Sequence, residues 1–150
     1  MERINKKNKR KEIKMATLID ISKTPDSIKT DDLVIEQGHC FLNSYRVAKN
    51  NNDTKIVEGL ILVVDNENGA KAMPHVWNKQ NGVYFDVTSE KILAEKDKVN
   101  EIKEIKYFST KYYKHTHFKN GDNLKFSFDT IENVNAINES LNKNENKQEE

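Results

Sequence analysis

The chain has 150 residues, a third of them charged, and the charges nearly cancel to a formal net +1 at pH 7. This length is enough for about one domain with a modest core, and the balanced charge provides no general field that attracts nucleic acid or a membrane surface. The single cysteine excludes an internal disulfide and a zinc site built from several cysteines. A lone thiol is typical of a reducing compartment, so we expect a cytoplasmic protein.

The two ends of the chain are its most polar parts. Residues 1–14 carry five lysines and two arginines against two glutamates, which predicts a solvated basic tail. The tail has no aromatic side chains to stack on bases, so we do not expect a nucleic-acid partner. Residues 142–150 form a polar, low-complexity segment for which we predict disorder. Between the tails, residues 15–141 are expected to form one domain.

Neither end nor middle suggests a membrane segment. The longest apolar run is far shorter than the roughly 20 residues that span a bilayer. The basic N-terminus is not followed by the apolar stretch of a secretory signal. We therefore expect no membrane association.

The first half of the domain is predicted to contain a helix and then a strand. Met15–Ile21 fits either a short strand or a helical turn. Apolar residues recur at helical spacing over Cys40–Lys49, and the polar turn Asn50–Asp53 ends this helix. Lys55–Val64 is β-branched and almost continuously apolar, as in a central strand. Gly59 inside this strand indicates a bulge or a close backbone approach.

A hairpin follows, with strands over Ala70–Lys79 and Val83–Val87. The Asn81-Gly82 pair between them is the strongest hairpin signal in the chain and favours a two-residue turn.

This two-residue turn sets a register in which the residue numbers of each opposed pair add up to the same value as those of Asn81 and Gly82. His75 is then opposite Thr88, and Asp86 is its diagonal neighbour on the same face, within side-chain reach. The pattern therefore predicts that a histidine and a carboxylate meet on adjacent strands.

The remaining elements carry less information about function. We predict a polar helix over residues 89–98, a strand over 102–107 and a helix over 129–141 with Asp129 as its N-cap. His115 and His117 could share a strand face and bind a metal, but two ligands make a weak site. An exposed aromatic and basic loop is the preferred interpretation of that stretch.

Cys40 is placed as a nucleophile would be. It falls in the first turn of the predicted helix, where unpaired N–H groups and the positive end of the helix dipole favour a thiolate. His39 is its neighbour in sequence, but successive helical residues do not face one another. His75 is therefore the better candidate for the base.

Taken together, four motifs resemble the core of the transglutaminase-like branch of the papain-like superfamily. They are Gly38-His39-Cys40 opening a helix, Val57-Glu58-Gly59 in a strand, His75-Val76-Trp77, and the run from Gly82 to Thr88. They occur in the family's order over about a third of the chain. The resemblance implies an α+β, papain-like domain in which the nucleophile helix packs on an antiparallel sheet.

The resemblance also implies a mechanism. Cys40 would be the nucleophile, His75 the general base and acid, and Asp86 the carboxylate that orients the imidazole. The expected substrate is a protein or peptide carboxamide. Hydrolysis by a peptidase or amidase comes first, and amine transfer or glutamine deamidation second. Neither a metal nor a cofactor is implied.

Three further residues are candidates for substrate binding. Gln37 precedes Cys40 by only three residues, closer than the oxyanion-hole glutamine of papain-like enzymes. Asn43 lies one turn after Cys40 and either lines the cleft or faces water. Trp77 is either a cleft wall or a core residue.

Two interpretations from other classes stay open at this stage. The motifs could be retained for packing in a non-catalytic binding module. Alternatively, the chain could be a small accessory protein of a phage or mobile element that binds a host protein through its charged tails.

Overall fold

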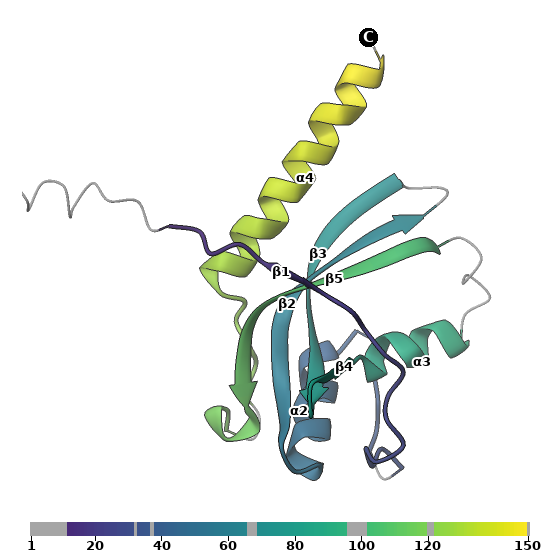
Figure 1. Cartoon of the computed structure of the whole chain (residues 1–150), viewed down its shortest axis with the longest axis vertical. Coiled ribbons are helices and arrows are strands. Elements are labelled where there is room, and N and C mark those ends of the chain that lie inside the picture. Colours follow the sequence, from purple (N-terminus) through teal and green to yellow (C-terminus); the bar gives the residue numbers. More distant parts are fainter. Residues whose placement is uncertain are drawn as a thin grey trace, which may run out of the picture.

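An antiparallel sheet organises the described part of the chain, with five strands in the order β1-β5-β2-β3-β4 (Figure 1). The computed structural model describes residues 12–31, 33–36, 38–65, 69–95, 102–119 and 122–149. The elements, in chain order, are β1 (Thr17–Ile19), α2 (Cys40–Asn50), β2 (Thr54–Asp65), β3 (Gly69–Gln80), β4 (Val83–Phe85), α3 (Val87–Glu95), β5 (Ile102–Lys114), the 3-10 helix η2 (His115–His117) and α4 (Phe128–Glu149). This confirms the predicted α+β class. Most of the predicted basic tail, residues 1–11, lies outside the described residues.

The central strand β2 pairs along its whole length with β3, from Thr54 opposite Gln80 to Asp65 opposite Gly69. Its other edge pairs with β5, which runs to Lys114 rather than ending near residue 107 as predicted. The aromatic and basic stretch is therefore mostly strand. Residues 56–61 of β2 are all buried, so both faces of the strand are covered, which explains its nearly continuous apolar sequence.

The predicted hairpin register is confirmed. Asn81 and Gly82 both have positive φ, at 50° and 80°, as a type I′ turn requires. The pairs on either side run from Gln80 opposite Val83 to Asn78 opposite Phe85.

The predicted length of the third strand was wrong. β4 ends at Phe85, and Val87 and Thr88 already belong to α3, so Thr88 does not pair with His75. The reason is a competing local signal. The Asp86 carboxylate accepts a hydrogen bond from the Ser89 N–H at 3.2 Å, which makes Asp86 the N-cap of a helix.

The sheet curls until its two edge strands approach each other. Ile21, just after β1, forms a parallel bridge with Tyr84 of β4, and the Ser22 N–H donates to the Tyr84 carbonyl at 2.8 Å. Inside the curl, Val57, Ile61, Trp77 and Tyr107 form a buried cluster. The concave face of the sheet is thus filled by side chains.

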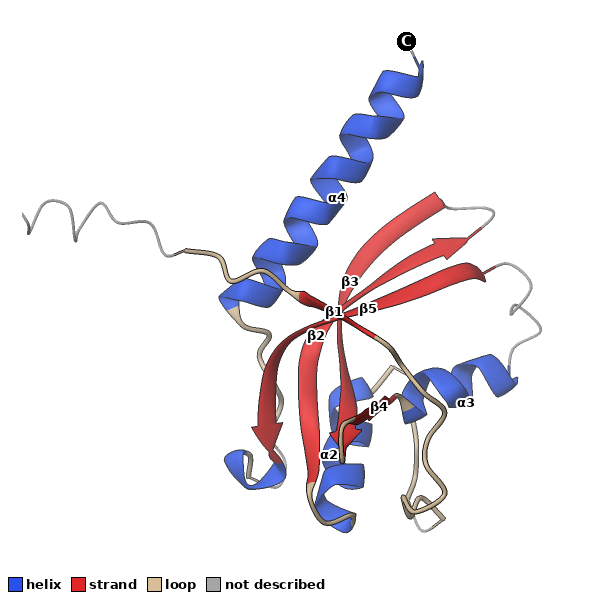
Figure 2. Cartoon of the chain, viewed as in Figure 1, coloured by secondary structure: helices blue, strands red, loops and turns tan. Residues whose placement is uncertain are grey.

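The helices α2 and α3 lie toward one end of the sheet and α4 toward the other (Figure 2). Tyr45 and Ala48 of α2 pack on Ile56 and Val76 of the sheet. This confirms that the helix beginning at Cys40 packs on an antiparallel sheet.

Helix α4 differs from its predicted form at both ends. Ser127 is the N-cap, since its hydroxyl accepts from the Thr130 N–H, and Asp129 lies inside the first turn. The helix continues to Glu149, through residues predicted to be a disordered tail. Extending an existing helix through Glu, Lys and Gln costs little, because nucleation has already occurred.

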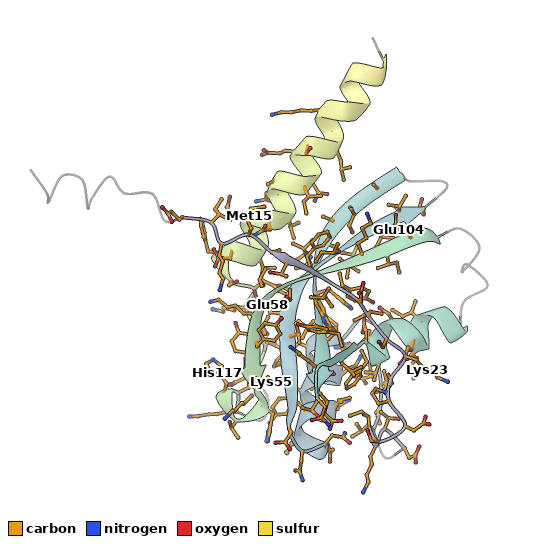
Figure 3. All side chains as sticks on the ribbon, viewed as in Figure 1. Met15, Lys23, Lys55, Glu58, Glu104 and His117 are labelled. Atoms are coloured by element: carbon orange, nitrogen blue, oxygen red, sulfur yellow. The ribbon has the colours of Figure 1, made fainter. Side chains whose placement is uncertain are left out.

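Buried Glu58 fixes the start of α4 to the sheet. Its carboxylate accepts from Tyr113 Oη at 2.9 Å, Ser127 N at 2.9 Å and Ser127 Oγ at 2.7 Å, and also from Thr130 Oγ1. Figure 3 shows Glu58 on the strand that runs through the middle of the sheet. The charge of a fully buried carboxylate is thereby balanced by donors and by the positive end of a helix.

Four asparagine side chains act as clamps on the backbone of other segments. In each, the amide oxygen accepts from a peptide N–H, and the amide nitrogen donates to a nearby carbonyl. The clamps are Asn43 on Glu36, Asn51 on Lys29, Asn133 on Lys14 and Ala16, and Asn138 on Ala72. They satisfy backbone groups of segments that lack a complete ladder of their own.

Gly59 is required by packing. A Cβ there would lie 2.0 Å from the Phe108 carbonyl oxygen and 2.6 Å from Cη2 of Trp77. The β5 register also shifts beside this residue, between Glu58 and Gly59. Both predicted meanings of this glycine, a bulge and a close approach, are confirmed.

We predict that Gly59→Ala lowers the free energy of unfolding by about 2–4 kcal/mol, because neither a backbone carbonyl nor a buried indole can easily move away. Urea unfolding followed by circular dichroism measures this. The control is Gly82→Asn, where nothing lies within 4 Å of the added Cβ and asparagine tolerates positive φ. A Gly59→Ala protein as stable as this control would contradict the close contact.

Candidate active site

The centre of the site is a buried ion pair between β3 and the start of α3. His75 Nε2 lies 2.7 Å from Asp86 Oδ2. The side chain of His75 is 12% exposed and that of Asp86 is 3% exposed. The predicted meeting of the two residues is confirmed, although Asp86 reaches His75 from a helix cap and not from a paired strand.

Asp86 is held by more than its histidine. Oδ2 also accepts from the Ser89 hydroxyl at 2.5 Å and the Tyr107 hydroxyl at 2.7 Å, and the Tyr107 hydroxyl lies 3.0 Å from Ser89 Oγ. The carboxylate caps α3, so the positive end of that helix dipole faces it. These donors come from two separate elements and fix the position of the acid.

Cys40 completes the arrangement from the first residue of α2. Gly38, two residues before it, has φ 82°, a left-handed conformation that brings the chain sharply into the helix. Cys40 lies near enough to the His75 ring to contribute to the rise in the imidazole pKa. Because Nε2 faces Asp86, Nδ1 is the nitrogen left for the thiol. The structure thus brings together all three residues predicted to be catalytic.

The electrostatics keep His75 protonated. Burial by itself lowers the pKa of the imidazole, but the Asp86 carboxylate, its hydrogen bond and the contact with Cys40 outweigh burial and raise the pKa from 6.5 to about 10. For Asp86, burial by itself raises the pKa of the carboxyl group. The interactions with His75, Ser89 and Tyr107 lower it by more, so the net shift is downward. At neutral pH the pair is therefore an imidazolium and a carboxylate.

Trp77 supports His75 from within the core. Its ring stacks on the imidazole with 6.0 Å between centroids and meets the Tyr107 ring edge-on at 5.2 Å. The indole is fully buried, so it has no surface to offer a substrate in this structure. Of the two interpretations of Trp77, the core residue is the one observed.

Asn43 is also buried, contrary to both predicted alternatives. Its amide nitrogen donates to the Glu36 carbonyl at 2.7 Å and to Thr88 Oγ1 at 2.9 Å, and its oxygen accepts from the Glu36 N–H. All of its hydrogen-bonding capacity is directed inward. Asn43 therefore positions the approach to α2 rather than binding substrate.

Gln37 lies outside the described residues, so its role in substrate binding stays a prediction. His39 precedes α2 and makes no capping hydrogen bond through its side chain. His117 packs on the rings of Tyr113 and Phe118.

Sequence reasoning missed Ser89 and Tyr107. Ser89 had a local signal, since it follows Asp86 at the spacing of a helix cap and its third residue. Tyr107 had none, because it is 21 residues from Asp86 and belongs to a strand on the far side of β2.

Among the described residues, no group of three or more His, Cys, Asp or Glu side chains is placed to hold a metal ion. The helices of this part of the chain also lack the length and apolarity needed to cross a bilayer.

Comparison with protein-family models, with curated proteins and with solved structures gave no match.

We predict that Asp86→Asn lowers the His75 pKa from about 10 to below 6.5, because burial is then the dominant remaining influence. Asparagine is also a good N-cap, so α3 is retained. NMR titration of the His75 Cε1–H signal measures the change. Asp129→Asn, an aspartate-to-asparagine change in the first turn of α4, is the control and should leave the His75 curve unchanged. A His75 curve that also stays unchanged in Asp86→Asn would rule out the carboxylate as the cause.

The same pair makes stability depend on pH. The His75 pKa is raised on folding, so its contribution is complete below 6.5 and is lost as pH rises toward 10. The Asp86 pKa is lowered, so its contribution is complete above 3.8 and is lost in more acidic solution. The difference in unfolding free energy between the wild type and Asp86→Asn should therefore be largest between these two limits and shrink toward pH 10.

We predict that Tyr107→Phe lowers the free energy of unfolding by about 1.5–3 kcal/mol, since a buried carboxylate loses a donor while the ring contact with Trp77 remains. Tyr45→Phe is the matched control, because that tyrosine is also buried but has no hydroxyl partner among the described residues. Urea unfolding at neutral pH compares them. Equal losses in the two variants would show that the Tyr107 hydroxyl does not matter to Asp86.

Proposed function

We propose that this chain is a cysteine-dependent acyl-transfer enzyme of papain-like, transglutaminase-like type, acting on carboxamides of peptides or proteins. The observation that carries the proposal is the chain of contacts Cys40–His75–Asp86, in which one imidazole is shared by a thiol and a buried carboxylate. Either contact alone would be compatible with a structural role. The ordered sequence motifs add to this support.

The first half of the reaction forms a thioester. An imidazolium beside a thiol stabilises the thiolate, which is the nucleophilic form. The Cys40 sulfur attacks the carbonyl carbon of the amide and forms a C–S bond, while the carbonyl electron pair moves to oxygen. The intermediate collapses as the C–N bond breaks, and His75 gives its proton to the departing nitrogen.

The second half releases the acyl group. Neutral His75 takes a proton from water, the hydroxide oxygen bonds to the carbonyl carbon, and the C–S bond breaks. The products are a carboxylic acid, which loses its proton to solvent at neutral pH, and the freed amine, and the thiolate–imidazolium pair is restored. An amine in place of water gives a new amide by the same steps.

The start of α2 is suited to stabilising the oxyanion. The first N–H groups of a helix have no intrahelical partner, and no side-chain hydrogen bond from His39 caps this helix. By contrast, Asp86 caps α3 and Ser127 caps α4. The first N–H groups of α2 are therefore available beside Cys40, whereas α3 and α4 each donate one such N–H to a capping side chain.

We predict that iodoacetamide modifies Cys40 at about pH 6 at least tenfold faster in the wild type than in His75→Gln, because only the wild type has an imidazolium beside the thiol. Mass spectrometry of the intact protein follows the reaction. His39→Gln is the control, since it removes the adjacent histidine and should leave the rate unchanged. Equal rates in the wild type and His75→Gln would overturn the proposal.

The acyl step is tested with p-nitrophenyl acetate. The enzyme should release nitrophenolate and gain one acetyl group on Cys40, and Cys40→Ser should gain none. A glutamine-containing peptide offered with and without an added amine then separates amide hydrolysis, deamidation and transfer by product mass. A protein that is alkylated slowly and never acylated would instead fit the binding-module interpretation.

A further inference from the structure

Three lysines stand side by side across the sheet, away from the candidate active site. Lys55 of β2 is directly opposite Lys79 of β3 and directly opposite Lys114 of β5. Directly opposed residues share a face and lie about 5 Å apart at Cβ, and like charges in such pairs are destabilising. This row therefore costs stability in the isolated protein.

Only one of the three lysines has a compensating partner. Lys79 Nζ lies 4.7 Å from the centre of the Tyr84 ring and 5.3 Å from that of Tyr112, a cation–π arrangement. Lys55 and Lys114 form no salt bridge with any described residue, and both are exposed. Within the described part of the chain, these two opposed lysines therefore have no salt-bridge partner.

These two lysines line a cavity of about 310 Å³ together with Lys49, His115 and Asp53. It lies where the end of α2 meets the start of β2 and the end of β5. Figure 3 shows Lys55 at the same end of the sheet as η2, to which His117 belongs. The lining includes one aspartate and three lysines, so it has a net positive charge.

We propose that this cavity binds a small molecule carrying a phosphate group. A phosphate monoester has a charge close to −2 at neutral pH, which balances the opposed pair Lys55 and Lys114, whereas a carboxylate balances only one. The volume is at the lower end of the range for small-ligand sites, about 300–1,000 Å³. Ammonium and imidazole N–H groups are suitable donors to phosphate oxygens.

The site is separate from the acyl chemistry. The cavity is at the C-terminal end of α2 and Cys40 at its N-terminal end, which places them about 13 Å apart along the helix axis. The two proposals can therefore be tested independently, and the failure of one does not contradict the other.

Phenyl phosphate, with benzoate as the matched monoanion, tests the proposal in the full chain at low salt. Amide NMR shifts should concentrate around residues 51–55 and 114–116, and the Kd for phenyl phosphate should be at least about tenfold lower than for benzoate. Lys55→Gln and Lys114→Gln should each weaken binding by roughly tenfold or more. Lys71→Gln, a strand lysine at the other end of β3, should not.

Several results would overturn the proposal. Equal affinity for benzoate, equal shifts at Lys71, or no saturation with phenyl phosphate would show that anions are attracted nonspecifically and that the cavity is not a phosphate site. Tighter binding of a single-stranded oligonucleotide at the same residues would assign it to a nucleic-acid backbone.

A second measurement needs no ligand. Lys114→Gln removes the charge opposite Lys55, so its melting temperature at low salt should rise above that of the wild type, and added salt should reduce the difference. A lower melting temperature, with normal binding of phenyl phosphate, would show that the two lysines do not repel and would remove the basis of the proposal.

Discussion

The buried pair of His75 and Asp86 is the interaction on which the rest of the structure depends. Taking two charges out of water is costly unless their remaining hydrogen-bonding capacity is also satisfied. Here the hydroxyls of Ser89 and Tyr107 donate hydrogen bonds to the Asp86 carboxylate, and the helix dipole of α3 stabilises its charge further. Because β3, α3 and β5 each contribute a group, the same contacts that set the charge of the imidazole also hold three elements together.

This pair also explains the packing beneath it. The imidazole stacks on Trp77, and the indole has room only because Gly59 on the neighbouring strand has no side chain. The tryptophan and the glycine are thus core requirements that a non-catalytic domain of this fold would share. The thiol is different. Cys40 also packs against the core beside Tyr45 and Val76, but its position beside a charged imidazole is what the proposal of an enzyme, rather than a binding module, depends on.

Local signals allowed some of this to be predicted. The Asn81-Gly82 turn determines its own register, which predicted that His75 and Asp86 meet. The helix pattern placed Cys40 at the start of a helix, and its meeting with His75 was implied by the family resemblance. The strand through Val87 was wrong because alternating apolar residues continue past the point where Asp86 caps a helix. Tyr107 could not be predicted, since its contact with Asp86 joins distant segments. The asparagine clamps were equally invisible, because their targets are backbone groups that carry no sequence signal.

The clamp formed by Asn138 affects how readily the sheet edge can associate with other copies of the protein. β4 pairs with only the last residues of β3, so within the described residues the stretch from Gly69 to Trp77 has no strand on that side. An open edge of this kind invites pairing with another chain and aggregation. Asn138 of α4 occupies both the N–H and the carbonyl of Ala72, as a neighbouring strand would. Helix α4 therefore protects the sheet against edge-to-edge association at that point, without adding a strand to it.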